Sequence, residues 1–314
     1  MLKRILHSLV LIFLINPVPA FAQQPSSHQS ELNEILRRAR LSISEYKAKF
    51  KDLTAEEEQT IEEFDAQGKV EKLRRVASDL FIYQSQLDPN EMFEYRDVKS
   101  VNGVAVKKRE ARLVNLLTKA TKAVSVKKEF DRILRESQRY DLGNSFYGMT
   151  LNQGITLDEK GGEAFQYKLA GREQVNGHDS IVVEYQQVSQ TPAHKFDLRN
   201  LPGPLKGAVA LYRGRLWLDA ETAQIRREVR EVTLQLPSLD HPLMFYRFEL
   251  DYAHSRFGFL TPRRLVITFY SRGRLDADKK PVTLVGARTT FEYGAFTRFS
   301  VEAPDASITS PAKP

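Results

Sequence analysis

The stretch GRLWLDAETAQIRREVREV, residues 214–232, holds the only tryptophan of the chain, Trp217, followed closely by Asp219 and Glu221. The pattern predicts a strand that ends at Asp219, a turn over residues 220–224 and a returning strand over 225–232. Turns favour polar residues, so we interpret both carboxylates as turn residues and not as catalytic acids. Side chains alternate along a strand, which places Leu216 and Leu218 on one face and Trp217 on the other. Parity alone leaves open which face meets the core.

The same two-residue period runs through most of the second half of the chain. In HPLMFYRFELDYAH (241–254), Met244, Tyr246, Phe248, Leu250 and Tyr252 alternate with Phe245, Arg247, Glu249 and Asp251. Similar runs occur at 165–169, 181–185, 265–269 and 281–302, and short turns such as Asn176-Gly177 separate neighbouring runs. The pattern predicts an antiparallel meander with one apolar face and one wetted face.

Helical spacing appears in two other segments. Apolar residues recur every three or four positions from about Ser30, a plausible N-cap, to Leu53. A second helical pattern covers residues 108–142 and stops at Gly143, with its basic residues mostly on the opposite face. We interpret that basic face as solvated, with a membrane-contact stripe as the alternative. Between the two lie a charged hairpin turning at Gln67-Gly68 and a strand ending at Asn102-Gly103, and the tip of the hairpin is expected to stand in water.

Together these patterns predict an α+β fold. We expect a strongly curved antiparallel sheet of about ten strands, a half-barrel, with amphipathic helices packed on its concave face, because so wide a sheet curls and its apolar face needs cover. Residues 23–302 are expected to form one domain, with 189–207 as a long loop inside it, and residues 303–314 to form a flexible tail.

The first 22 residues predict an export signal that is cleaved near Ala22. Lys3 and Arg4 precede a short apolar run, and Ala20-Phe21-Ala22 fits the small-x-small rule for cleavage. Removing this segment lowers the formal net charge from +7 to +5, because it contains two basic residues and no acid. The chain has no cysteine, which excludes disulfides, thiol catalysis and lipidation on a cysteine. A periplasmic or secreted location follows, with no membrane span after cleavage and no nucleic-acid partner.

Two hairpins carry a resemblance to a known family. FQYKLAGREQVNGHDSIVVEY (165–185) and GRLWLDAETAQIRREV (214–229) resemble hairpins of the LolA/LolB-type periplasmic lipoprotein carriers and the related RseB-like sensors. The stretches FEYRDVKSVNGVAVKKREARLVNLL (93–117) and SQRYDLGNSF (137–146) are also similar to a group of uncharacterised secreted bacterial proteins of this architecture. The resemblance implies a curved sheet, a lipid or acylated protein as ligand, and no cofactor.

The resemblance further implies an apolar cavity between the sheet and the helices. The side chains expected to line it are Phe165, Tyr167, Leu169, Ile181, Val183, Tyr185, Leu216, Leu218, Met244, Tyr246, Phe248 and Leu250. Each buried methylene contributes about 0.8 kcal/mol, so an acyl chain can be held without a specific polar residue. The alternative is that these side chains form an ordinary packed core.

Motifs for chemistry are weak throughout. No two histidines of the expected mature domain share a metal-ligand spacing, and neither a nucleophile elbow nor a phosphate-binding glycine loop occurs. The cluster of five glutamates at 56–63 is interpreted as part of the exposed hairpin, with Lys69, Lys72, Arg74 and Arg75 as cross-strand partners. We therefore expect no enzyme and no metal. The first hypothesis is a carrier or sensor of a lipid or lipoprotein acyl chain, the second is an envelope module that binds another protein, and a secreted hydrolase is the least favoured.

Overall fold

The computed structural model describes residues 27–85, 87–88, 91–109, 125, 127–128, 131, 134–135, 139–140, 148–157, 162–190, 208–236, 241–275 and 281–298. The second predicted helix, over residues 108–142, and the predicted loop at 189–207 lie mostly outside these residues. The predicted export signal and tail lie outside them entirely.

Helix α1 spans Ser27–Lys49 and is amphipathic as predicted. It begins three residues before Ser30 and ends four residues before Leu53, which instead opens the first strand. The helix ends early because Asp52 adopts a left-handed backbone conformation, with φ 53°, which an α-helix cannot continue through. The apolar stripe of the helix is buried; its members are Leu32, Ile35, Leu36, Ala39, Ile43 and Tyr46.

The described chain forms one sheet. Its strands are β1 (Leu53–Phe64), β2 (Val70–Gln84), β3 (Met92–Val101), β4 (Val104–Ala105), β5 (Phe165–Val175), β6 (His178–Gln187), β7 (Val209–Asp219), β8 (Ile225–Gln235), β9 (Leu243–His254), β10 (Leu260–Leu275), β11 (Pro281–Tyr293) and β12 (Thr297–Arg298). Two short 3₁₀ turns, η1 (Ile155–Leu157) and η2 (Gly162–Ala164), precede β5. All strands except β4 and β12 have ten residues or more, so the prediction of about ten strands is confirmed.

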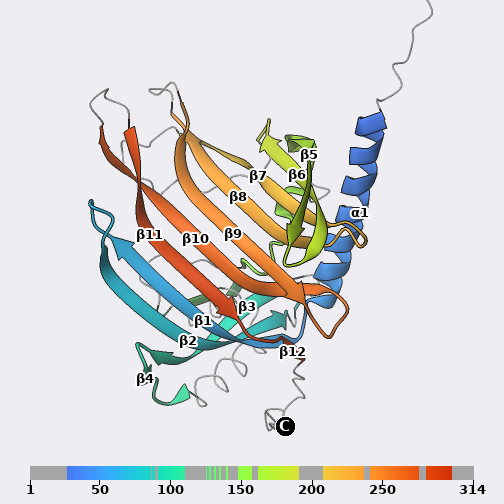
Figure 1. The fold of residues 1–314 in the computed structure, drawn as a ribbon. Coiled ribbons are helices and arrows are strands. Elements are labelled where there is room, and N and C mark those ends of the chain that lie inside the picture. The colour runs from blue at the N-terminus through green and yellow to red at the C-terminus, as the bar shows by residue number, and fades with distance from the viewer. Residues whose placement is uncertain are drawn as a thin grey trace, which may run out of the picture.

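The strand order is β4-β3-β2-β1-β11-β10-β9-β8-β7-β6-β5, and all pairings are antiparallel. Strands β5 to β11 form the predicted meander, and the first hairpin joins it through β1 and the last long strand, β11. The sheet is strongly curved and open, with β4 and β5 at its two ends, and α1 lies beside the half that contains β5 to β8 (Figure 1). This is the predicted half-barrel, and the α+β fold class is confirmed.

The two faces of the sheet carry different side chains. The concave face and α1 together form one large apolar core, which includes Leu216, Leu218, Phe248 and Leu250. A separate small cluster on the outer face contains Val175, Val182, Trp217 and Val229. Trp217 therefore lies on the side away from the helix, which settles the question that parity left open.

One side chain expected on the wetted face lies in the core. Phe245 is buried, although it alternates in the sequence with Met244 and Tyr246, which were predicted to face inward. The register between β8 and β9 shifts at this point, so that Val232 pairs with Tyr246 and Thr233 pairs with Met244. The extra residue of this β-bulge is Phe245, and a bulge redirects a side chain from the face that strict alternation assigns to it.

The interpretation of the first hairpin as an exposed, charged element holds at its tip and on the outer face of β1, where Glu56 and Glu58 are exposed. Residues 66–73 are exposed, and Lys72 pairs with Glu63 at 2.7 Å as expected. Glu57, however, is 1% exposed and pairs with Arg96 of β3, because its side chain points to the concave face, where the register places the core residue Tyr293 opposite it. The assignment of all five glutamates to a wetted hairpin was therefore wrong for Glu57.

Candidate functional site: the concave face

The side chains predicted to line a cavity all come from β5, β6, β7 and β9. Eight of them are buried members of the core: Phe165, Ile181, Val183, Tyr185, Leu216, Leu218, Phe248 and Leu250. Tyr167, Leu169 and Tyr246 are half-buried against the same core. The placement of Met244 in this set was wrong, because the bulge pairs it with Thr233, between the core residues Val232 and Leu234, and so turns it to the outer face. The fold thus brings most of the set together on the concave face.

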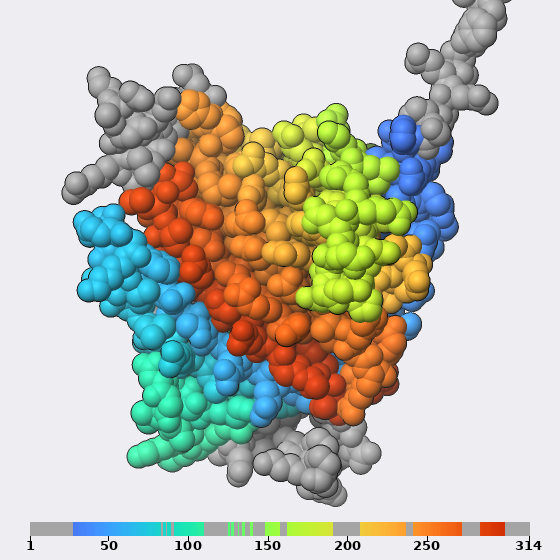
Figure 2. Space-filling view, viewed as in Figure 1, coloured from blue at the N-terminus to red at the C-terminus, as the bar shows by residue number. Residues whose placement is uncertain are grey.

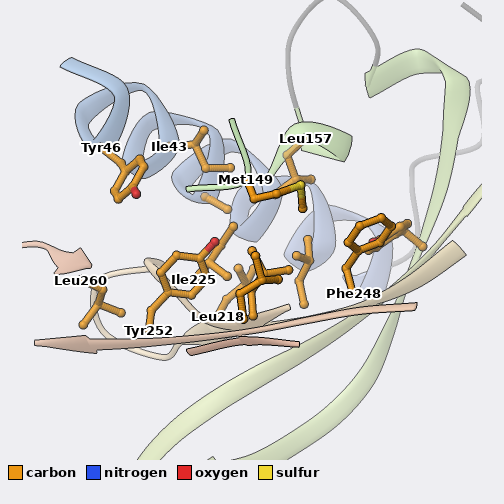
Figure 3. Packing of buried hydrophobic residues seen from close by; sticks show 14 of the residues in the cluster. Ile43, Tyr46, Met149, Leu157, Leu218, Ile225, Phe248, Tyr252 and Leu260 are labelled. Atoms are coloured by element: carbon orange, nitrogen blue, oxygen red, sulfur yellow. The ribbon is translucent and has the colours of Figure 1, made fainter. Parts of the chain in front are cut away.

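The centre of this face is occupied by protein. Helix α1 crosses it, and the segment 148–157 lies between the helix and the strands, with Met149 and Leu157 packed above Leu218 and Phe248 (Figure 3). Gly154 is so closely enclosed that a Cβ added to it would lie 2.8 Å from a methyl group of Ile225 and still closer to Ile43. The middle of the concave face is a packed core at this position.

Polar side chains of the sheet hold this segment down. Glu94 of β3, fully buried, accepts hydrogen bonds from the backbone amides of Gly148 and Thr150, both at 2.8 Å. The Thr150 hydroxyl donates to the same carboxylate at 2.5 Å, and the Tyr46 hydroxyl donates to the Thr150 carbonyl at 2.8 Å. Buried polar backbone groups need partners, and these contacts supply them.

A second polar group on the concave face is the pair Glu228 and Arg230 in β8. Their closest contact is 2.6 Å, and both side chains are at most 5% exposed. Arg230 donates to the Asn152 carbonyl at 3.2 Å, while Glu228 accepts from the Gly154 amide at 3.3 Å. Burial alone would lower the pKa of Arg230, but the adjacent Glu228 raises it above its usual value, so the guanidinium stays charged.

A third buried group joins β1 and β3. Arg96 donates to Glu57 at 2.7 and 3.0 Å and to Glu94 at 3.3 Å. The guanidinium also lies 5.3 Å from the centre of the Phe291 ring. Burial by itself lowers the pKa of Arg96, but the two glutamates outweigh it and raise the pKa well above the usual value. These contacts connect the first hairpin, β11 and the segment 148–157.

The concave face is less covered beyond this centre. Cross-strand register places Tyr212 opposite Val232, Val232 opposite Tyr246, and Tyr246 opposite Phe269. Tyr212, Tyr246 and Phe269 are half-buried and pack against the core, and the rings of Tyr246 and Phe269 lie 5.4 Å apart. They form a row of three partly exposed rings on β7, β9 and β10, with the fully buried Val232 of β8 between Tyr212 and Tyr246, which we call the aromatic row.

Sequence reasoning placed Tyr246 in the candidate site but missed Tyr212, Glu228 and Arg230. For Glu228 and Arg230 a signal existed: the valines of RREVREV are three residues apart, not two. That spacing puts Val229 and Val232 on opposite faces and turns Glu228 and Arg230 toward the core. No comparable signal marked Tyr212.

The opening hairpin has a structural role. Asp219 accepts hydrogen bonds from the Thr222 amide and hydroxyl, both at 2.8 Å, and pairs with Arg226 at 2.5 Å. Burial raises the pKa of Asp219, but the Thr222 and Arg226 contacts outweigh it and lower the pKa below the usual value. The Trp217 indole donates to Glu173 at 2.8 Å. These partners fix the turn and the strand.

The His178 and His254 rings, from β6 and β9, lie 5.2 Å apart. Within the described ranges no group of three or more histidine, aspartate or glutamate residues is arranged to hold a metal ion. In the same part of the chain, no helix combines the length and apolarity needed to cross a membrane.

No protein-family model matches the chain, and no curated protein sequence matches it significantly. Similar solved structures include a DUF1329 family protein from Desulfovibrio piger, which is 11% identical over 87% of this chain and 95% of that chain, with a TM-score of 0.34. An outer membrane lipoprotein-sorting protein domain from Vibrio parahaemolyticus is 11% identical over 82% of this chain and 91% of that chain, with a TM-score of 0.35. A LolA superfamily protein from Nitrosomonas europaea is 9% identical over 88% of this chain and 97% of that chain, with a TM-score of 0.29.

Proposed function

We propose that this protein is an exported, periplasmic binding protein that carries or senses an acyl chain of a lipid or lipoprotein on the concave face. Residues 1–22 would be its cleaved export signal and residues 23–302 its single domain. It would act without a cofactor and without catalysing a reaction. Of the cavity candidates named from the sequence, Tyr246 lies in the aromatic row and would contribute apolar surface, while the eight buried candidates would support the row from the core.

The observation that carries the proposal is the aromatic row. Tyr212, Tyr246 and Phe269 are partly exposed, yet they continue a buried apolar core across neighbouring strands. Burial of apolar surface is worth about 25 cal/mol per Å², so a chain lying along this row would be held without polar contacts. The core beneath the row is rigid, which lowers the entropic cost of binding.

The test is uptake of a fluorescent fatty acid by delipidated protein, together with mass spectrometry of lipids extracted after gentle purification. Phe269→Gln is expected to weaken uptake about tenfold, since a partly buried ring contributes roughly 1.5 kcal/mol or more. Tyr270→Gln is the matched control, because Tyr270 is the next residue of β10 and lies on the outer face. Protein that neither carries lipid nor takes up the probe would refute the proposal.

A second candidate function is an envelope module that binds another protein without transporting a ligand. Its support is the filled centre of the concave face, where α1 and the segment 148–157 leave a packed core. Residues 66–73 at the tip of the first hairpin would be the contact. The test replaces only this tip, because deletion of β1 and β2 would remove strands from the interior of the sheet. A co-purifying envelope protein that is lost on this replacement would favour the second function.

A further inference from the structure

The outer face of the sheet carries two adjoining hollows that lie away from the aromatic row, although the cavity candidates Tyr167 and Tyr185 border the larger one. One has a volume of about 790 Å³ over β5 to β9, the other about 310 Å³ over β9 to β11, and Arg247 borders both. Figure 2 views the outer face, on which β1, β11, β10 and β9 follow one another as bands beside β5 and β6. We call the two together the outer groove. Its larger part has the size usual for a ligand site, roughly 300–1,000 Å³.

Basic side chains dominate the lining. The charged residues that border the outer groove are Lys168, Arg213, Arg215, Arg227, Arg247, Arg264 and Arg288, against Glu184, Glu231 and Glu249. Two further carboxylates pair with these arginines, Asp251 with Arg227 at 3.7 Å and Glu292 with Arg264 at 4.0 Å. Seven basic and five acidic groups leave a formal excess of two positive charges. Like charges lining a concave surface raise its potential and attract ions of the opposite sign.

The carboxylates hold the arginines in place without neutralising all of them. Glu231 is shared by Arg213 at 2.8 Å and Arg247 at 2.9 Å. Glu249 is likewise shared by Arg247 at 3.1 Å and Arg227 at 3.4 Å. Each of these carboxylates therefore fixes two guanidinium groups from neighbouring strands. The row of cations is preorganised, which lowers the entropic cost of binding an anion.

The floor of the larger hollow is rigid and apolar. Trp217 and Val229 form it together with the buried outer-face cluster, and the Arg227 guanidinium lies 5.3 Å from the centre of the Trp217 ring. The side chains of Arg213 and Arg247 are 52% and 34% exposed, so each still has donors that face solvent. Guanidinium groups bind phosphate oxygens bidentately, and planar forks at fixed positions favour that ligand.

We propose that the outer groove is a second binding site, independent of the concave face, for a ligand that carries several phosphate groups. A free phosphorylated molecule and the phosphate headgroups of an anionic lipid present the same chemistry. The hollow holds one molecule of moderate size.

Isothermal titration of the folded mature chain with inositol hexakisphosphate tests the site. Binding is expected, and it weakens as salt is raised because the contacts are exposed to solvent. Arg213→Gln and Arg247→Gln should each weaken it about tenfold, the effect of losing one hydrogen bond to a charged group. Arg37→Gln on α1 is the matched control: it removes the same charge from an exposed ion pair outside the groove and should leave affinity unchanged. Urea unfolding of Arg213→Gln and Arg247→Gln should match that of the parent, so that a loss of binding is not a loss of folding.

Flotation with vesicles distinguishes the two sources of phosphate. Binding to phosphatidylglycerol vesicles, but not to phosphatidylcholine vesicles, that is lost in Arg247→Gln assigns the site to lipid headgroups. Binding of inositol hexakisphosphate without vesicle binding assigns it to a free ligand. The proposal is overturned if the protein binds neither inositol hexakisphosphate nor phosphatidylglycerol vesicles. It is also overturned if Arg37→Gln and Arg247→Gln weaken binding equally. Fatty-acid uptake on the concave face is measured separately, so either site can fail without the other.

Discussion

The buried pair of Arg96 and Glu57 gives the sharpest test of how the sheet is held together. The Arg96 side chain is 6% exposed and that of Glu57 is fully buried, with contacts of 2.7 and 3.0 Å. Arg96→Met keeps much of the side-chain volume but leaves Glu57 charged and without its guanidinium partner. Removing one member of a buried pair costs about 3–5 kcal/mol, a large share of the roughly 5–15 kcal/mol that stabilises a typical protein.

The assay is equilibrium unfolding in urea, followed by far-UV circular dichroism and by the fluorescence of Trp217, the only tryptophan. Coincident transitions would justify a single free energy of unfolding for each variant. Lys72→Met is the control, because it breaks a pair of similar length, 2.7 Å, at the exposed hairpin tip. Its side chain is 61% exposed, and such surface pairs contribute about 0–1 kcal/mol.

The double variant Glu57→Gln/Arg96→Met separates the cost of an unpaired charge from the cost of altered packing. Neutralising Glu57 should recover about 1 kcal/mol or more of what Arg96→Met loses, since one of the two buried carboxylates that lose the guanidinium is then uncharged. The other, Glu94, keeps its hydrogen bonds from Gly148 and Thr150. Arg96→Lys, which keeps the charge but not the two-pronged contact, should fall between the parent and Arg96→Met. If Arg96→Met costs no more than Lys72→Met, the reasoning about this pair is refuted.

Three further predictions concern the tryptophan, the glycine turns and Asp219. Trp217→Phe should lower the free energy of unfolding by about 1–2 kcal/mol through loss of the indole hydrogen bond, and urea unfolding measures this loss. In the parent protein, inositol hexakisphosphate should alter the fluorescence emission of Trp217. An unchanged spectrum at saturation would contradict the place of Trp217 in the outer groove. Gly154→Ala should lower the melting temperature far more than Gly177→Ala. Both glycines have positive φ, but only Gly154 is enclosed by other side chains. Equal decreases in melting temperature would argue against a packed centre of the concave face. Asp219 has a lowered pKa in the folded protein, so its stabilising contribution is fully present above the unfolded value of about 3.9 and is lost as pH falls through the folded pKa. The stability gap between the parent and Asp219→Asn, measured by urea unfolding at several pH values, should therefore be constant near neutrality and narrow below about pH 4; a gap that does not narrow would refute the assignment.

Local patterns determined the elements of this protein. The alternation in residues 165–169, 181–185 and 244–252 predicted strands, and the spacing of apolar residues after Ser30 predicted α1. These predictions held because side-chain direction within a strand or helix depends only on neighbouring residues. The prediction that Leu216 and Trp217 lie on opposite faces of the sheet followed from the same rule.

Tertiary structure decided everything that depends on residues far apart in the chain. The pairing of β1 with β11 joins segments separated by more than two hundred residues, and no local pattern encodes it. It places Tyr293 opposite Glu57 on the concave face, while Arg96 reaches Glu57 from β3 across β2, so Glu57 is buried although its neighbours in sequence are wetted glutamates. The bulge at Phe245 and the choice of the outer face for Trp217 also depend on the partner strand and on the position of α1. The local sequence specifies which side chains share a face of a strand. Which other segments cover that face is decided only when the strands pair and the sheet curves around its core.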